Sequence, residues 1–153
     1  MIQTIDDSVV VFSLGDLRFA LGISAVVRVV RAVEILPLSG APQAVRGVIN
    51  VQGKILPVFD PRERFGIPEE PITSRDHLII ANTQSHMVAL MVDTVEEIVT
   101  LAEAEVTYAD EILPELKGVS GVMKLDSNLI LLYDMNQFLS IADEKALQLV
   151  LES

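Results

Sequence analysis

Short apolar runs recur along the chain and are separated by residues typical of turns. Val, Ile and Leu dominate these runs, and such side chains suit a pleated, half-buried surface. Gly15-Asp16 and Gly53-Lys54 lie between neighbouring runs, where glycine supplies the positive φ of a tight hairpin. The pattern predicts a mainly β protein, with a long loop and a helical turn over 102–117. The expected strands lie near residues 8–14, 17–23, 26–36, 45–52, 54–60, 76–83, 86–92, 94–101, 118–126 and 128–134.

The chain also contains an internal repeat. Residues 45–60 match residues 119–134 at an offset of 74, and residues 20–26 match residues 89–95 at an offset of 69. Each copy supplies about five strands, which can lose their exposed edges by curling into a small barrel. The repeat predicts two tandem five-stranded β-barrels with a groove where they meet. Because residues 68–74 are typical of a linker, we expect the barrels to be formed by residues 8–75 and 76–139.

A helical pattern follows the last strand. Ser140 to Asp143 has the form of a capping box, with a serine that can accept early N–H groups. Leu139, Ala142, Ala146 and Leu149 then recur at helical spacing. We predict a C-terminal helix over 140–152 that packs against a barrel. The alternative is a helix that binds a partner.

Two acids each follow a repeated hairpin. Asp60 precedes Pro61, a residue suited to the first turn of a helix. Asp60 is therefore predicted to cap a short helix that runs through Arg64, and Asp134 to cap residues 135–139. We interpret both acids as structural caps and not as catalytic groups.

The charge distribution excludes several partners. The net charge is −11; residues 1–75 hold eight Lys/Arg and eight Asp/Glu, whereas residues 76–153 hold three and fourteen. This excess of acids argues against nucleic-acid binding and against docking on anionic lipid. No apolar run approaches the roughly 20 residues of a membrane helix, so we expect no membrane insertion. The start of the chain lacks the features of a signal peptide, and the absence of cysteine is compatible with the cytoplasm.

Catalytic and metal-binding patterns are also missing from the sequence. It contains no phosphate-binding glycine loop, and neither His77 nor His86 has a second ligand at metal spacing. Glu96 and Glu97 are adjacent in a predicted strand, so they point to opposite faces. We therefore predict a protein that is not an enzyme and has no cofactor or metal.

Basic residues of the first half allow two interpretations. Arg46, Arg62 and Arg64 lie close together in the sequence. They form either a solvated face or a docking surface for an acidic partner. Without catalytic chemistry, function is expected to depend on protein surface.

Residues 45–66 resemble the most typical stretch of the CheW family. That family reads G-V-I-N-L-R-G and then P-V-x-D-L-R-x-x-F, and this chain reads GVINVQG and then PVFDPRERF. Residues 9–15, 90–95 and 118–134 also resemble family segments. The resemblance covers roughly residues 8–140, with the segments in the expected order.

This resemblance implies two SH3-like barrels and a non-catalytic adaptor in the cytoplasm, held at membrane receptor arrays by protein contacts. Its implied partners are the regulatory domain of a CheA-type histidine kinase and the cytoplasmic tip of methyl-accepting chemotaxis receptors. Apolar strand ends of the first barrel are the implied kinase contact. The implied receptor-facing groove is lined by Val26, Arg28, Gly47, Asn50 and Gln52.

Two of these positions depart from the family pattern. The arginine of N-L-R-G is Gln52 here, and the acid of a V-x-E motif is Arg28. We hypothesise that Arg28 replaces the missing positive charge from a neighbouring strand. Two alternatives to the chemotaxis adaptor stay open. One is an adaptor of a related twitching or developmental pathway, and the other is a small-ligand-binding protein that uses the groove.

Overall fold

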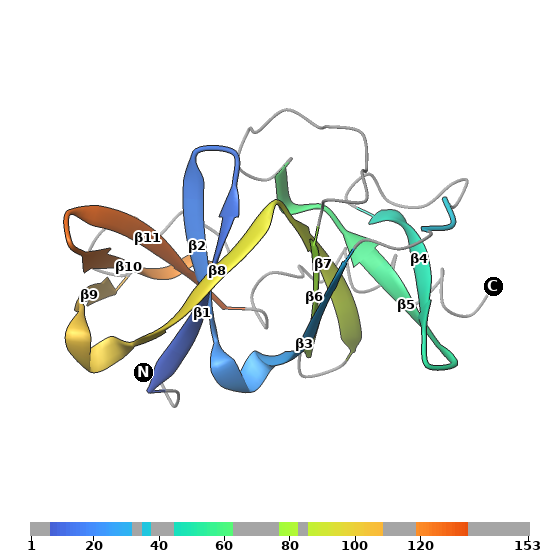
Figure 1. Ribbon diagram of the computed structural model, residues 1–153, viewed down its shortest axis with the longest axis horizontal. Helices are drawn as coiled ribbons and strands as arrows, with labels where there is room; N and C mark the ends of the chain where they lie inside the picture. The colour runs from blue at the N-terminus through green and yellow to red at the C-terminus, as the bar shows by residue number, and fades with distance from the viewer. Residues whose placement is uncertain are drawn as a thin grey trace.

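The computed structural model describes residues 7–31, 35–37, 45–62, 77–82, 86–108 and 119–134. These residues form two curled β-sheets that lie side by side along the longest axis of the molecule (Figure 1). The prediction of a mainly β protein with two small barrels is confirmed. The expected linker at 68–74 and the expected helix at 140–152 lie outside the described residues.

One barrel, barrel A, has six strands in the order β8-β1-β2-β11-β10-β9. All its neighbouring strands are antiparallel except β11 and β2, which run parallel. Its strands are β1 (Ser8–Leu14), β2 (Leu17–Gly22), β8 (Thr94–Thr100), β9 (Glu105–Tyr108), β10 (Val119–Leu125) and β11 (Asn128–Tyr133). A 3₁₀ turn, η3 (Leu101–Glu103), joins β8 to β9. The prediction of a loop is therefore wrong at β9, a sixth strand that the sequence pattern did not indicate.

The second barrel, barrel B, has five strands in the order β3-β6-β7-β5-β4. Its strands are β3 (Val26–Arg31), β4 (Val45–Val51), β5 (Lys54–Phe59), β6 (His77–Asn82) and β7 (Met87–Val92). Here β5 and β7 form the parallel pair. The 3₁₀ turn η1 (Ile23–Ala25) carries the chain from β2 in barrel A to β3 in barrel B. Beyond β3, Leu36 forms an isolated bridge with Val48 of β4.

The barrels do not follow the expected division into residues 8–75 and 76–139. Strands β1 and β2 come from the first copy of the repeat but pair with β8 and β11 of the second copy. Conversely, β6 and β7 come from the second copy but pair with β3 and β5 of the first. Each barrel thus combines the first two strands of one copy with later strands of the other. Neither barrel is formed by a contiguous half of the chain.

Irregularities of the backbone recur at the same repeat positions. The β4–β5 pairing shifts register between Val45 and Gly47, and the β10–β11 pairing shifts between Val119 and Gly121, 74 residues later. The two hairpin turns also correspond. Positive φ angles occur at Gln52 and Gly53 in one turn, and at Asp126 and Ser127 in the other. The repeat is therefore one of backbone geometry as well as of sequence.

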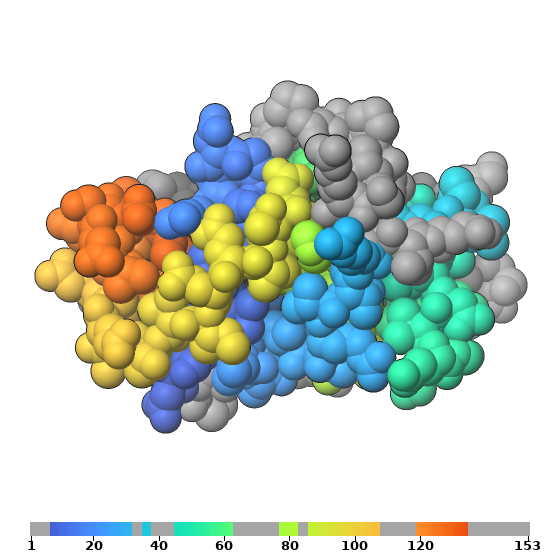
Figure 2. All heavy atoms as spheres, viewed as in Figure 1, coloured from blue at the N-terminus to red at the C-terminus, as the bar shows by residue number. Residues whose placement is uncertain are grey.

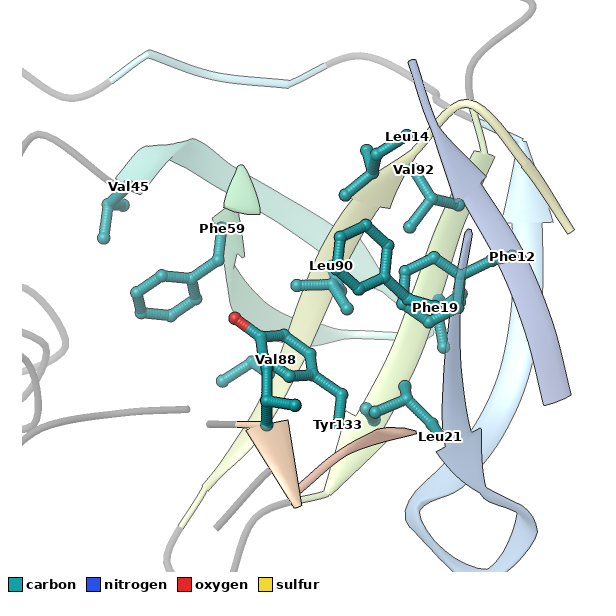
Figure 3. Packing of buried hydrophobic residues seen from close by; sticks show 13 residues of the cluster. Phe12, Leu14, Phe19, Leu21, Val45, Phe59, Val88, Leu90, Val92 and Tyr133 are labelled. Carbon is teal, nitrogen blue, oxygen red and sulfur yellow. The ribbon is translucent and has the colours of Figure 1, made fainter. Parts of the chain in front are cut away.

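Three clusters of buried side chains hold the barrels together. One fills barrel A and one fills barrel B. The third lies between the barrels and joins Phe12, Phe19 and Tyr133 of barrel A to residues such as Phe59 and Leu90 of barrel B (Figure 3). In the close-up these side chains point toward one another from strands of both barrels.

Strands β1, β2, β6 and β7 are buried on both faces. In β1, Val9 and Val11 point into barrel A, whereas Phe12 and Leu14 point into the core between the barrels. In β7, Ala89 faces the inside of barrel B and its neighbours face the shared core. A strand covered on both faces has a continuous apolar run and not an alternating one. The two barrels therefore form one body with a large shared core.

Candidate functional site

The two departures from the family pattern meet at the open side of barrel B. Arg28 lies in β3 and Gln52 follows β4, the two strands at opposite edges of the five-stranded sheet. Because the sheet curls, the Arg28 Nη2 donates a hydrogen bond of 3.5 Å to the Gln52 Oε1. This length is at the long limit of a hydrogen bond, so the contact is weak. The expected proximity is thus present, although β3 and β4 are not paired.

The hairpin turn fixes where the Gln52 side chain lies. Gln52 has a φ of +52° and Gly53 a φ of +87°, which is the backbone of a tight two-residue β-turn. The side chain of Asn50 supports this turn, because its Oδ1 accepts the backbone N–H of Gly53 at 2.9 Å. Arg28, Asn50 and Gln52 are all exposed. These three polar side chains therefore form one surface, which we call the β3–turn surface.

Gly47 is buried and has a structural role. The backbone of Leu36 crosses directly over β4, with two hydrogen bonds of 2.9 Å between Leu36 and Val48. A β-carbon at Gly47 would collide with the Leu36 carbonyl oxygen and would lie 2.9 Å from the Ile35 Cγ2. With a φ of +153°, the backbone also disfavours any other residue. Glycine is needed here for the close approach of two chain segments.

Val26 also has mainly a packing role. It begins β3, is half-buried and packs against the core between the barrels. All five sequence-predicted positions thus belong to barrel B or its hairpin turn, and the structure brings Arg28, Asn50 and Gln52 together at the surface. Val26 instead packs against the core between the barrels, and Gly47 lies against Leu36.

A second polar cluster, the Asp60 cluster, lies where barrel B meets barrel A. Asp60 and Arg62, only 4% and 2% exposed, directly follow β5. The Asp60 Oδ2 accepts from Arg46 Nη1 at 2.7 Å, and its Oδ1 accepts from the backbone N–H and Nη1 of Arg62 at 3.0 and 3.1 Å. The Arg62 Nη2 donates to the Asp93 Oδ1. One buried guanidinium therefore binds two carboxylates.

Asp93 extends this cluster to barrel A. It lies between β7 and β8, where the chain passes from one barrel to the other. Its Oδ2 accepts the backbone N–H of Gly15 at 2.6 Å, and its own N–H donates to the Ser13 carbonyl at 3.0 Å. The Nδ1 of His77 lies 3.3 Å from the Asp93 carbonyl oxygen. Asp93 thus ties the β1–β2 hairpin of barrel A to Arg62 of barrel B.

The electrostatics of Arg62 follow from this geometry. Burial by itself lowers the pKa of the guanidinium, because it disfavours the charged form. The nearby carboxylates of Asp60 and Asp93 more than offset this effect, so the pKa is raised above the ordinary arginine value. Arg62 therefore stays charged, although it is almost fully buried.

These contacts correct one sequence-based interpretation. Arg46 and Arg62 form neither a solvated face nor a docking surface, because both are paired with Asp60. Arg64, the third residue of the expected group, lies outside the described residues. The spacing Asp-x-Arg after a buried strand was the signal that could have indicated a buried pair. Asp60 accepts the Arg62 N–H, but the expected helix through Arg64 continues outside the described residues. The residues that Asp134 was predicted to cap also lie outside them.

Within the described part of the chain, no three His, Asp or Glu side chains gather as a metal site would require. Among the same residues, no helix is long and apolar enough to cross a membrane. Glu96 forms a salt bridge of 2.9 Å with Arg18 on the surface of barrel A, a contact between partly exposed partners that adds little stability.

Comparison with known proteins agrees with the fold. The family described as CheW-like domain matches residues 8–143. A chemotaxis protein CheW from Rhizobium meliloti is 28% identical over 139 residues, which cover 90% of each chain. One from Bacillus subtilis is 27% identical over 135 residues, which cover 87% of this chain and 86% of the relative.

A solved structure has the same architecture. The scaffolding protein CheW from Thermoanaerobacter tengcongensis superposes with a TM-score of 0.77 at 28% identity. The match covers 91% of this chain and 96% of the other. Two interlocked barrels, the repeated hairpins and a family match over most of the length lead to one conclusion. The chain belongs to the family of CheW-like domains, which are non-catalytic scaffolds of chemotaxis signalling.

Proposed function

We propose that this chain is the adaptor that couples methyl-accepting chemotaxis receptors to the regulatory domain of a CheA-type histidine kinase. The family match over residues 8–143 carries this proposal. The protein would act in the cytoplasm, beside membrane receptors that it binds through protein contacts. The core shared by the two barrels joins them into one body, which suits a scaffold that holds two partners together.

The β3–turn surface is the receptor-facing part of this proposal. Arg28 is exposed, and its contact with Gln52 is long and weak, so little is lost when a partner replaces it. Gln52 is uncharged, so Arg28 supplies the cation where the family pattern has arginine on the turn. A receptor that presents a carboxylate to this surface would gain a charge-assisted hydrogen bond. Gly47 and Val26 would act indirectly, by holding β3 and β4 in place.

Substitution of Arg28 and Gln52 together tests this assignment. We expect the double variant Arg28→Glu, Gln52→Arg to bind the native receptor tip about tenfold more weakly, because charge-assisted pairs contribute about 1.5–3 kcal/mol. Calorimetric titration of the variant against a purified fragment of the receptor tip measures this change.

A matched control comes from the internal repeat. Lys124 of β10 corresponds to Asn50 of β4. Lys124→Gln lowers the net charge by one unit, as does the double variant Arg28→Glu, Gln52→Arg. We expect this control to bind the receptor tip within about twofold of the unchanged protein. Equal affinities for all three proteins would exclude the β3–turn surface as the receptor contact.

A further inference from the structure

The β1–β2 hairpin belongs to barrel A in space, but the sequence links it to barrel B. Outside the hairpin itself, β1 pairs with β8 and β2 pairs with β11, so these contacts join residues 8–22 to residues 94–133. In the described part of the chain, one connection, η1, links the hairpin to the elements that follow. That connection leads to β3, a strand of the other barrel.

A second copy of this chain offers the same partners to the hairpin. Its β8 and β11 would pair with β1 and β2 residue for residue. The contacts of Asp93 would also form again, from its N–H to the Ser13 carbonyl and from the Gly15 N–H to its carboxylate. Exchange of an identical element between two copies is a low-cost route to a dimer, because every contact of the monomer is kept.

The internal repeat shows that such an exchange is compatible with this fold. The hairpin of the first repeat copy pairs with strands of the second, and the β6–β7 hairpin of the second pairs with strands of the first. The two copies within one chain have therefore already exchanged equivalent hairpins. Exchange between two molecules would repeat this arrangement with a different connection.

The η1 connection has the properties of a hinge. None of its three residues is buried, and in the space-filling view the blue atoms at the place of η1 lie on the surface (Figure 2). The residues on either side, Gly22 and Val26, already have the backbone angles of an extended chain. Straightening of η1 breaks the hydrogen bond from the Val26 N–H to the Ile23 carbonyl. It would join β2 and β3 into one extended segment that reaches a second molecule.

We propose that two copies of this chain form a closed dimer by exchanging their β1–β2 hairpins, with η1 as the hinge. Each barrel A then contains the hairpin of the other copy, whereas barrel B keeps all its own strands. This dimer goes beyond the proposed adaptor function, because its formation needs neither receptor nor kinase.

The packing of the hairpin determines when the exchange occurs. Val9 and Val11 are buried inside barrel A, and Phe12 and Phe19 are buried in the core between the barrels. Release of the hairpin therefore opens two cores at once, so a folded monomer exchanges slowly. Copies exchange hairpins mainly while they fold, when high concentration favours partners from another molecule.

Refolding of the full chain from urea at two concentrations tests the proposal first. We expect monomer after refolding at about 1 µM and a dimer fraction after refolding at about 500 µM, because dimer formation follows mass action. Size-exclusion chromatography with light scattering measures both species. The isolated dimer should persist on dilution. Monomer alone after refolding at both concentrations would overturn the proposal.

A pair of cysteines distinguishes a dimer with exchanged hairpins from one held by surface contacts. The chain has no cysteine, and Ser8 of β1 lies opposite Thr100 of β8. In the variant Ser8→Cys, Thr100→Cys, oxidation with copper phenanthroline should link the two copies of the dimer fraction covalently. The same oxidation should give only an internal disulfide in the monomer fraction. An internal disulfide in the dimer fraction would show that the hairpins are not exchanged.

The matched control pair lies outside the exchanged hairpin. Thr107 of β9 faces Val122 of β10, and both strands stay in the same molecule after exchange. The variant Thr107→Cys, Val122→Cys should therefore form an internal disulfide in the monomer and dimer fractions alike. Covalent dimers of this control as abundant as those of the first pair would indicate random collisions and would also overturn the proposal.

A change in hinge length gives an independent test. Two glycines inserted between Ser24 and Ala25 let the hairpin fold back more easily, so the dimer fraction should fall at least about fivefold at the same refolding concentration. The same insertion between Asp126 and Ser127, in the β10–β11 turn, leaves the hinge unchanged and should keep the dimer fraction within about twofold. Equal dimer fractions for the two insertions would exclude η1 as the hinge.

Discussion

Arg62→Met is expected to lower the free energy of unfolding by about 3–5 kcal/mol, a large part of the stability of a domain of this size. The guanidinium is buried and binds Asp60 and Asp93 at the same time. Methionine fills a similar volume but leaves the buried Asp60 with one cation fewer. The loss of a single partner from a buried ion pair costs far more than the pair contributes.

Urea unfolding followed by circular dichroism measures this change. Arg62→Lys keeps the charge but cannot bind both carboxylates with a planar fork, so an intermediate loss is expected. Arg31→Met is the control, because Arg31 is exposed and should change the free energy of unfolding by less than about 0.5 kcal/mol. If Arg62→Met lowers the free energy of unfolding by less than about 1 kcal/mol, Arg62 does not form a buried ion cluster with Asp60 and Asp93.

The pH dependence of this effect follows from the raised pKa of Arg62. A group whose pKa is raised by folding stabilises the protein at every pH below its unfolded value, and this contribution is lost only as the pH rises through the folded value. For arginine both values lie above the working range. The difference between the protein and Arg62→Met should therefore stay constant between pH 7 and pH 10.

Gly47→Ala is expected to cost about 3 kcal/mol or more, because two effects add. The φ of +153° is unfavourable for alanine, and the new β-carbon collides with the Leu36 backbone. Leu36 would have to leave β4, with the loss of both hydrogen bonds to Val48. Amide exchange of Val48, measured by NMR, should therefore accelerate more than exchange elsewhere in β4 and β5.

Gly53→Ala provides the matched control for this variant. Gly53 also has a positive φ, +87°, but an added β-carbon would meet no atom within 4 Å. Only the strain of a positive φ applies there, and we expect it to cost about 1 kcal/mol. Equal losses for Gly47→Ala and Gly53→Ala would show that the approach of Leu36 does not constrain β4.

The sequence predicted the kinds of element better than their partners. Repeated offsets of 74 and 69 residues identified equivalent strands, and these offsets recur in the bulges and the hairpin turns. However, knowing which strands are equivalent in the repeat does not reveal which strands pair in a sheet. Strand β1 has the same local surroundings whether its neighbour is β8 or β3, because those two strands are themselves equivalent.

The sequence nevertheless contained a physical sign that strands of one repeat copy pair with strands of the other. Val9 to Phe12 and Val88 to Val92 are unbroken apolar runs. Isolated small barrels need polar outer faces, so such runs indicate strands buried on both sides. They can be covered on both sides only where the two barrels pack together, as in the shared core.

The candidate site was predicted unevenly for related reasons. Arg28 was hypothesised from motif positions alone to lie on a strand beside Gln52; the two side chains are in contact, although β3 and β4 lie at opposite edges of the sheet. The Asp60 cluster was missed because Asp93 lies 31 residues from Arg62 in the sequence and is brought to it only by the crossing from β7 to β8. Charge patterns along the chain cannot distinguish a surface arginine from one that the fold buries.

A three-component capture experiment tests the adaptor function most directly. The receptor tip is immobilised, the regulatory domain of the kinase is added, and bound kinase is measured with and without this chain. We predict that the kinase is retained only when the chain is present, and that Arg28→Glu, Gln52→Arg reduces retention about tenfold. Equal retention of the kinase with and without the chain, with all three proteins folded, would contradict the proposed coupling.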